Sequence, residues 1–496
     1  MNSIENAIFL PALNRMENII NEIRHLFSSF SNDPVIHIGK IPQSGSIRIY
    51  FRIRTENGSF IAAYGENRKE NRAFILFSRH FKSAGCPVPA IYAVNPAETI
   101  YIQEDFGDQS LLNILEEKGY EPEVYSLFKK SLHELALLQI NGDRGLDYNY
   151  CITSREFGKQ AILSDLLYFK YYFLDALQIP YDKEKMLSDF DRLSEYLSEV
   201  QYCYFMFRDF QSRNILIQED GLHFIDYQGG MKGALQYDVA SMLWQAKANL
   251  PDEWKNSLLH SYIDSVESIL DQKIDRENFI SLFNGYVLIR LMQVLGAYGF
   301  RGLFERKAHF LTSIPLGLRN LRWYLQNKKT GVELPEFSRM MEEIVKDEII
   351  GRFEPIQATE KTPLIVHINS FSYRRGIPGD PSVNGGGFVF DCRGILNPGR
   401  IEEHKAKTGK DRLVKDYLEQ QTKMPAFLNS IFDIVDITVE EYIRRDFSSL
   451  MINFGCTGGQ HRSVYAAEAM ARHLRNKFRV KIELHHIEQE ALGLSL

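Results

Sequence analysis

The chain has 496 residues, enough for two to four domains, and its 44% apolar, 25% charged and 12% aromatic residues exclude a mainly disordered protein. With 58 Lys and Arg against 64 Asp and Glu, the formal net charge is −6, so the whole chain lacks the basic charge typical of nucleic-acid-binding proteins. No apolar run approaches the ~20 residues of a membrane span, and the start lacks a secretory signal. Five scattered cysteines favour reduced thiols. We therefore expect a cytoplasmic globular protein.

The first hundred residues predict a small, mostly antiparallel sheet that carries one helix. Residues 9–30 have the three-to-four spacing of a helix, whereas apolar and polar residues alternate from Ile47 to Ile53. A turn and the apolar run Phe60–Ala63 follow, which completes the pattern of a β-hairpin. A helix is expected from Arg68 to Ala84, where a glycine and a proline end it, and two short strands are expected within 91–103.

The rest of the chain predicts helices, a linker and a second sheet. Residues 110–200 and 235–345 have long amphipathic helical patterns, and a short β-rich segment, Asn214–Tyr227, lies between them. The stretch 347–362 mixes charged residues with Gly and Pro and has no sustained period, so we expect a linker there. After the linker, strands alternate with helices, which predicts an α/β layer structure of about 135 residues.

Three polar side chains lie close together in the sequence around the β-rich segment. Asp209 lies five residues before Asn214, and Asp226 follows twelve residues after Asn214. Phosphoryl transfer from ATP requires a carboxylate placed against the acceptor hydroxyl and oxygen ligands that hold Mg²⁺. Asp209 can supply the carboxylate, and Asn214 and Asp226 can supply the ligands. A hairpin between residues 215 and 225 would bring Asn214 and Asp226 close together in space.

This segment resembles the catalytic loop of protein-kinase-like and aminoglycoside-phosphotransferase-like enzymes. The sequences RDFQSRN (208–214), IDYQ (225–228) and LQYDVASML (235–243) are more closely similar to the anomeric sugar kinases that phosphorylate N-acetylmuramate and N-acetylglucosamine. The resemblance implies an α+β bilobal protein-kinase-like domain, with a small β lobe over residues 1–105 and a large helical lobe over residues 106–346.

The same resemblance implies ATP and Mg²⁺ as cofactors and a set of site residues. Asp209 would be the catalytic base, and Asn214 and Asp226 would be the Mg²⁺ ligands. The hinge between the lobes would be Gln103–Gly107. The nucleotide-binding residues would be Ser44, Gly45 and Ser46 of a phosphate-covering loop, Arg48, Glu70 as the structural acid of the small lobe, and Glu104 of the hinge.

Two features depart from the kinase pattern. The His that usually lies two residues before the base is Phe207 here, so other groups must hold the catalytic loop. The strand at 60–63 carries no Lys to pair with Glu70, and Arg48 or Arg52 is expected to take its place. An active kinase is the favoured interpretation because the oxygen-bearing residues of the site are present. The alternative is a pseudokinase that serves as a regulatory adapter without turnover.

In the last part of the chain, an apolar strand, a glycine-rich turn and a helix follow one another. The free backbone N–H groups and the helix dipole of such a unit favour phosphate, and Gly458 and Gly459 let the backbone come close to a ligand. His461 and Arg462 add hydrogen-bond donors and charge. Cys456 and Arg462 also have the C-x5-R spacing of cysteine phosphatases, so catalysis at Cys456 is an alternative. A tight glycine turn without a ligand is another.

GCTGGQHRSV (455–464), together with FSYRRGIP (371–378) and FDCRGILNP (390–398), resembles the C-terminal domain of the RNase adapter RapZ. That domain senses glucosamine-6-phosphate and, in enterobacteria, binds small RNA. The resemblance implies that residues 363–496 form an α/β strand–Gly loop–helix domain that binds a phosphorylated amino sugar. Its site residues would be Asp391, Arg393, Thr457, Gly458, Gly459, His461 and Arg462.

RNA is a less favoured partner of this domain. Residues 364–496 contain 18 Lys and Arg against 16 Asp and Glu, a net charge of +2, and the basic tail of RapZ is missing from residues 485–496. Zinc is not expected, because no His pair has ligand spacing with Cys. The resemblances of the kinase-like part and of the C-terminal part each imply an amino sugar. We expect an ATP/Mg²⁺-dependent phosphotransferase that acts on a hydroxyl of a small molecule, an amino sugar, fused to a domain that senses a phosphorylated amino sugar such as glucosamine-6-phosphate.

Overall fold

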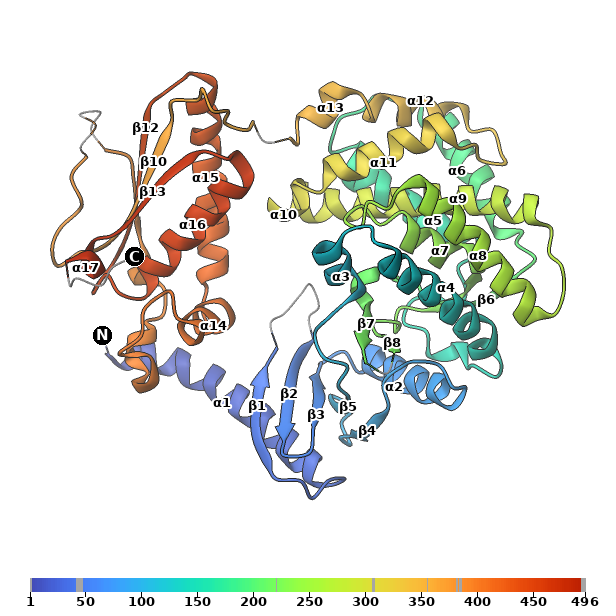
Figure 1. The fold of residues 1–496 in the computed structure, drawn as a ribbon, viewed down its shortest axis with the longest axis horizontal. Helices are drawn as coiled ribbons and strands as arrows, with labels where there is room; N and C mark the ends of the chain where they lie inside the picture. The colour runs from blue at the N-terminus through green and yellow to red at the C-terminus, as the bar shows by residue number, and fades with distance from the viewer. Residues whose placement is uncertain are drawn as a thin grey trace. The chain divides into compact units, whose positions relative to one another are not determined.

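The computed structural model describes residues 2–41, 48–219, 221–305, 308–354, 356–380, 382 and 386–491. The chain divides into two compact units (Figure 1). The first unit is formed by Met1–Phe304 and Leu316–Lys346, and the second by Glu305–Pro315 and Asp347–Leu496.

The first unit begins with an antiparallel sheet whose strand order is β1-β2-β3-β5-β4 (Figure 1). Alternation along β2 places Phe51 and Ile53 on the buried face, in one core with Ile23 and Phe27 of α1. Strands β2 and β3 form the predicted hairpin, with Phe51 opposite Ala62. Strand β1 was not predicted. The elements of this lobe are α1 (Asn2–Ser28), β1 (Val35–Lys40), β2 (Ile49–Thr55), β3 (Ser59–Tyr64), α2 (Arg68–Ser83), β4 (Ile91–Val94) and β5 (Ile100–Glu104).

The rest of the first unit is mainly helical, with two small antiparallel sheets of two strands each. Two π-helical turns, Lys170–Leu174 and Gly299–Phe304, pack so closely that a Cβ atom on Gly299 would lie 2.1 Å from the main-chain oxygen of Tyr172. The elements are α3 (Leu111–Lys118), α4 (Pro122–Asp143), α5 (Lys159–Phe169), α6 (Lys183–Ser198), β6 (Cys203–Met206), β7 (Ile215–Gln218), β8 (Gly221–Phe224), β9 (Met231–Ala234), α7 (Leu235–Leu243), α8 (Asp252–Leu270), α9 (Arg276–Tyr298), α11 (Ile314–Asn327) and α12 (Pro335–Ile344).

The second unit is built on a parallel sheet with the strand order β11-β12-β10-β13. Val366, Ile368, Leu450 and Ile452 lie on the buried face of this sheet, in one core with residues of α15 and α16. The segment expected as a linker contains α13, and Ala358 within it donates its backbone N–H to Phe478 at 2.7 Å. The elements are α10 (Ala308–Leu311), α13 (Asp347–Gly351), β10 (Ile365–Ser372), β11 (Phe388–Asp391), α14 (Arg412–Gln421), α15 (Met424–Arg444), β12 (Ser449–Cys456), α16 (Arg462–Phe478), β13 (Lys481–His486) and α17 (Ile487–Glu490).

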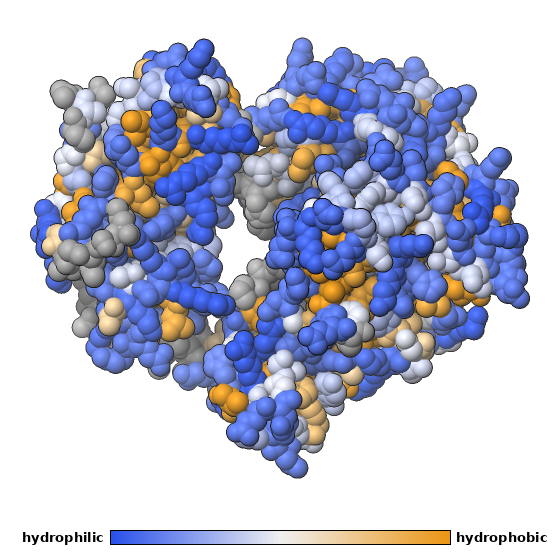
Figure 2. Space-filling view, in the orientation of Figure 1, coloured by the Kyte–Doolittle hydropathy of each residue, from blue (hydrophilic) through white to orange (hydrophobic). Residues whose placement is uncertain are grey.

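One continuous helical stretch, Arg276–Phe304, is long and apolar enough to cross a membrane by length and composition. Most of its apolar window, 72%, is buried inside the protein, as expected for a core helix. The face of the molecule seen in Figure 2 is mostly hydrophilic, and its hydrophobic residues form separate patches.

Candidate functional site

The hairpin of β7 and β8 brings the predicted metal ligands together. Ile215 pairs with Phe224, so Asn214 before β7 lies beside Asp226 after β8. Asn214 Nδ2 is 3.3 Å from Asp226 Oδ2 and donates to the main-chain oxygen of Asp209 at 2.9 Å. The side chain of Asp209 is 43% exposed, whereas Asn214 is buried. The three side chains therefore share one site, with Asp209 on its open side.

The Asp226 carboxylate is in an environment that favours a bound cation. Burial raises its pKa, and the negative charge of Asp209 adds to the increase. Its backbone φ of +73° is strained for a residue with a Cβ, which is typical of functional sites. Gln228 Nε2 donates to Asp226 Oδ1 at 2.9 Å, and the buried Oε1 atom of Gln228 has no hydrogen-bond partner among the described residues. The carboxylate and amide oxygens of Asp226, Asn214 and Gln228 suit Mg²⁺, which prefers oxygen ligands.

Asp238 on α7 anchors the catalytic loop in place of the missing His. Its carboxylate accepts the backbone N–H of Phe207 at 2.7 Å, the backbone N–H of Arg208 at 2.9 Å and Gln139 Nε2 at 2.9 Å. Burial raises the pKa of Asp238 to about 7, although these three donors lower it. Sequence analysis missed Asp238. The available signal was an acidic residue in the otherwise uncharged helix LQYDVASML, all of whose residues are buried.

A partly buried arginine, Arg208, and a buried one, Arg290, support the catalytic loop, and sequence analysis missed both. Arg208 Nη2 donates to Asp165 Oδ1 at 2.8 Å, and its guanidinium lies 5.3 Å from the ring centre of Tyr237. Arg290 on α9 lies 5.9 Å from the same ring, and its Nη2 is 3.5 Å from Asp209 Oδ1. The carboxylate of Asp209 is thus held next to a buried positive charge.

In the small lobe, Arg48 pairs with Glu70. Arg48 Nε is 3.1 Å from Glu70 Oε1, and its Nη1 donates to the Tyr101 hydroxyl at 3.0 Å. Arg52, the other candidate, binds Asp105 and Asp108 instead. Arg48, which directly precedes β2, thus makes the ion pair that a lysine on β3 usually makes.

The remaining nucleotide-binding candidates either make contacts within the small lobe or lie outside the described residues. The Glu104 side chain accepts from Lys82 Nζ at 2.9 Å and from the Ala90 backbone at 3.1 Å, so it is occupied within the small lobe. Phe106, in the predicted hinge, stacks on His223 with ring centres 3.8 Å apart. Ser44, Gly45 and Ser46 lie outside the described residues.

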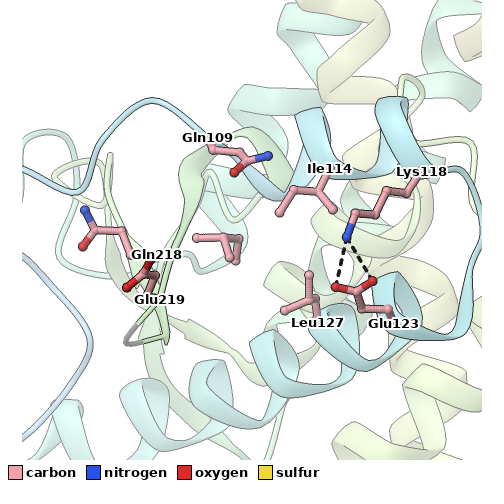
Figure 3. Close-up of a pocket in the computed structure, with 8 residues that line it drawn as sticks. Gln109, Ile114, Lys118, Glu123, Leu127, Gln218 and Glu219 are labelled. Atoms are coloured by element: carbon pink, nitrogen blue, oxygen red, sulfur yellow. Dashed lines mark hydrogen bonds and ion pairs between the residues drawn. The ribbon is translucent and has the colours of Figure 1, made fainter.

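A pocket of about 760 Å³ lies next to the hinge but does not include the Asp209 cluster (Figure 3). Ile114, Leu127 and Ile217 give it apolar walls, and the ion pair of Lys118 and Glu123 lies at one end of it. It holds no catalytic candidate, so the catalytic site is defined by the side-chain cluster and not by this pocket.

In the second unit, the predicted sugar-phosphate residues lie at or after the carboxyl ends of the parallel strands, where α/β sheets usually bind ligands. Thr457 and Gly458 are exposed, and Gly459 has a φ of +65°, which favours glycine. The buried Cys456 Sγ accepts the Gly459 N–H at 3.2 Å and contacts Ser463 Oγ at 3.2 Å. The loop therefore closes around the cysteine sulfur.

The charged residues among the predicted sugar-phosphate ligands differ in their exposure to solvent. Asp391 and Arg393 are exposed and form an ion pair, and the Arg393 guanidinium lies 3.9 Å from the ring centre of Tyr373. Arg462 is buried, and its Nη1 donates to the main-chain oxygens of Arg393 at 3.1 Å and Ile395 at 2.7 Å. Its buried Nε has no hydrogen-bond partner in the part of the chain that the structure describes.

The ring of His461 contacts the segment that carries His404. Its Nε2 lies 2.9 Å from the main-chain oxygen of His404, and burial lowers the pKa of the ring. In this arrangement the Nε2 atom of His461 is engaged by the His404 main-chain oxygen. The role of His461 as a hydrogen-bond donor to a phosphate stays a prediction.

Two family models match the chain. Residues 40–271 match the phosphotransferase enzyme family, and residues 364–490 match the RapZ C-terminal domain. A nucleotide-binding protein of Endomicrobium trichonymphae is 38% identical over 138 residues, which are 28% of this chain and 46% of the relative. One of Ruminiclostridium cellulolyticum is 34% identical over 181 residues, which are 36% of this chain and 60% of the relative. The chain spans about half the length of the curated relatives it matches.

Solved structures resemble the chain at low sequence identity. Choline kinase LicA from Streptococcus pneumoniae is 14% identical, with 62% of this chain and 100% of that chain covered and a TM-score of 0.42. Amicoumacin kinase hAmiN is 11% identical, with 65% and 97% covered and a TM-score of 0.46. The predicted bilobal kinase-like domain followed by an α/β domain is confirmed. The chain thus joins a region that matches the phosphotransferase enzyme family to a region that matches the RapZ C-terminal domain.

Proposed function

We propose that the first unit is an ATP/Mg²⁺-dependent kinase whose acceptor is a hydroxyl of an amino sugar. The observation that carries this proposal is the cluster on the β7–β8 hairpin, where Asp209, with a side chain that is 43% exposed, lies beside the buried Asn214 and the partly buried Asp226. Such a cluster provides the carboxylate and the oxygen ligands that phosphoryl transfer needs.

In the proposed reaction, the acceptor oxygen forms a bond to the γ-phosphorus of ATP, the bond from that phosphorus to the bridging oxygen of ADP breaks, and the hydroxyl proton passes to Asp209. When bound, Mg²⁺ neutralises negative charge on the phosphates. Asn214 and Asp226 would hold it, with Gln228 as a third oxygen donor. Asp238 fixes the loop that carries Asp209 through the two backbone N–H groups that it accepts.

The small lobe would hold the nucleotide. The pair of Arg48 and Glu70 provides a guanidinium that can bind phosphate oxygens, and its positive charge opposes the increase that burial causes in the pKa of Asp226. The hinge and the segment 44–46 complete the proposed nucleotide site.

In this proposal the second unit senses a phosphorylated amino sugar, such as glucosamine-6-phosphate, in the cytoplasm. The exposed Thr457 and Gly458, the exposed Arg393 and the unpartnered Nε of Arg462 support a phosphate site at the strand ends. The match to the RapZ C-terminal domain supports an amino sugar as the ligand, and by extension as the class of acceptor. RNA remains a less favoured partner.

The experiment is an ADP-release assay of the full chain with a panel of amino sugars, in parallel with Asp209→Asn. Sugar-dependent ADP release by the wild type that is lost in Asp209→Asn supports the kinase. Nucleotide binding without ADP release on any acceptor supports the pseudokinase adapter. Addition of glucosamine-6-phosphate tests the coupling of the units, because a changed rate would make the fusion a feedback device.

A further inference from the structure

Two free thiols, Cys392 and Cys456, occupy neighbouring positions at the carboxyl ends of β11 and β12. The two strands are parallel partners, and Asp391 lies opposite Gly455, so the next residue along each strand is a cysteine. Because paired strands lie about 4.7–4.9 Å apart and disulfides join Cα atoms roughly 4.4–6.8 Å apart, this register allows a disulfide with little movement of the strands.

The two thiols also belong to one face of the sheet. Side chains two residues apart along a strand share a face. Two residues before the cysteines, the rings of Phe390 and Phe454 contact each other across the strands, with ring centres 5.5 Å apart. Cys392 and Cys456 are both members of the buried core on this face. The cysteines are therefore the next cross-strand pair after the two phenylalanines.

The two sulfur atoms differ in their surroundings. Gly459 donates its backbone N–H to Cys456 Sγ at 3.2 Å, and Ser463 Oγ, in the first turn of α16, lies 3.2 Å from the same sulfur. Hydrogen-bond donors and a helix N-terminus stabilise a thiolate, which is the nucleophilic form of cysteine. Burial raises the pKa of the Cys392 thiol. Cys456 is therefore the sulfur that reacts first, and Cys392 is the thiol that follows.

The glycine loop gives a small oxidant a route to the Cys456 sulfur. Cys456 itself is 3% exposed, but Thr457 and Gly458, the two residues that follow it, are exposed. A Cβ atom on Gly458 would meet no other atom within 4 Å, so the space over this residue is open. Hydrogen peroxide is much smaller than a sugar phosphate and needs little of that space.

We propose that Cys392 and Cys456 form a disulfide when a peroxide oxidises the chain, and that this bond releases the glycine loop. In the first step the Cys456 sulfur takes one oxygen from hydrogen peroxide, the O–O bond breaks, and a sulfenic acid and water are formed. The Cys392 sulfur then bonds to the Cys456 sulfur, the S–O bond breaks, and the hydroxyl group leaves with the Cys392 proton as a second water. The two thiols lose two electrons, and the peroxide gains them.

The disulfide changes the loop because the Cys456 sulfur also holds the loop closed. A sulfur bonded to Cys392 turns toward β11 and no longer accepts the Gly459 N–H. Arg462 binds the main-chain oxygens of residues 393 and 395, which directly follow Cys392, so the new bond also displaces this part of the proposed sugar-phosphate site. Because these contacts oppose the disulfide, a reductant should open it easily. The effect on a ligand rests on the proposed function of the second unit, whereas the disulfide itself does not.

The first test treats the folded full chain with hydrogen peroxide and identifies linked peptides by mass spectrometry. We expect a linked pair of peptides that contain Cys392 and Cys456, lighter by two hydrogen atoms than the free peptides together, which dithiothreitol separates. Cys392→Ser should lack this pair and leave Cys456 as a sulfenic acid. Cys203→Ser is the matched control, because Cys203 is an exposed thiol of the first unit, and it should form the same pair as the wild type.

The second test measures the glycine loop with and without a ligand. Hydrogen exchange of the backbone N–H groups in residues 457–463 should be faster in the oxidised wild type than in the reduced wild type, and unchanged by peroxide in Cys392→Ser. Calorimetry with glucosamine-6-phosphate should find an affinity about tenfold lower after oxidation, because the Gly459 N–H is left unpaired. Dithiothreitol should restore the affinity, and Cys392→Ser should keep its affinity throughout.

Two results would overturn the inference. The first is oxidation of Cys456 in the folded chain without a link to Cys392, or a link that forms only after the chain has been unfolded. The second is a linked chain in which hydrogen exchange of residues 457–463 equals that of the reduced chain. A reduced wild type that does not bind glucosamine-6-phosphate would contradict the proposed function of the second unit alone, because the linked peptides and the hydrogen exchange are measured without a ligand.

Discussion

Asp238→Asn tests whether the carboxylate on α7 replaces the missing His as the anchor of the catalytic loop. In the wild type, one Asp238 oxygen lies 2.7 Å from the Phe207 nitrogen and the other lies 2.9 Å from the Arg208 nitrogen. An asparagine has only one oxygen, so its amide N–H₂ group would face one of these backbone N–H donors. The substitution therefore removes one hydrogen bond and leaves a buried donor unpaired.

An unpaired buried donor costs about 1–3 kcal/mol, so the unfolding free energy should fall by that amount. The loop that carries Asp209 should move as well. A displacement of about 1 Å at a reacting group can cost about a hundredfold in rate. We therefore expect kcat to fall about a hundredfold, with the KM for ATP changed much less, because the Arg48 pair lies in the other lobe.

Asp189→Asn is the control for a general loss of stability. Asp189 is also a buried carboxylate that accepts a backbone N–H, that of Phe337 at 2.9 Å, but it joins α6 to α12. Asp189→Asn should lower the urea concentration at the midpoint of unfolding without a comparable loss of kcat. Urea denaturation and ADP release are measured on both variants. A kcat of Asp238→Asn close to that of the wild type would refute the anchoring role.

Further predictions concern the proposed Mg²⁺ site, the proposed ATP site and the glycine loop of the second unit. Asp226→Ala should raise the Mg²⁺ concentration needed for half-maximal activity at least about tenfold, since a ligand carboxylate is lost; an unchanged Mg²⁺ titration would contradict the metal role. Arg48→Met should raise the KM for ATP about tenfold, since Glu70 loses its partner; an unaltered KM would exclude a nucleotide role for Arg48. Calorimetry with glucosamine-6-phosphate should find binding weakened about a hundredfold in Arg462→Ala, which loses the guanidinium that holds residues 393–395, and near-wild-type binding in Cys456→Ser. Phosphate release by the wild type but not by Cys456→Ser would instead favour a phosphatase.

The fold was largely predictable because its signals are local. The alternation at β2, the helix pattern of α2 and the strand–glycine loop–helix unit around Gly459 depend on residues that are adjacent in the sequence. Strand β1 was missed because an exposed edge strand has little apolar alternation, and only one of its six residues, Ile38, is buried. The long helical patterns could not predict where helices break, since the π-helical turn at Gly299 depends on its packing against Tyr172.

The catalytic cluster was predictable for the same reason, since Asn214 and Asp226 are joined by a short hairpin. The residues that support it come from distant parts of the chain. Asp238 and Arg290 act on the loop only after α7 and α9 have packed, and no spacing links them to Asp209. The choice between Arg48 and Arg52 likewise depended on which side chain the sheet turns toward Glu70.

The most direct test of the account is product analysis by phosphorus NMR after incubation of the full chain with ATP, Mg²⁺ and N-acetylmuramate or N-acetylglucosamine. The account predicts a new sugar phosphomonoester that forms in step with ADP and that is reduced about 10²–10⁴-fold in Asp209→Asn, which lacks the proton acceptor but keeps the nucleotide site. Formation of ADP and free phosphate without a phosphorylated sugar, or an equal yield of sugar phosphate from Asp209→Asn, would contradict it.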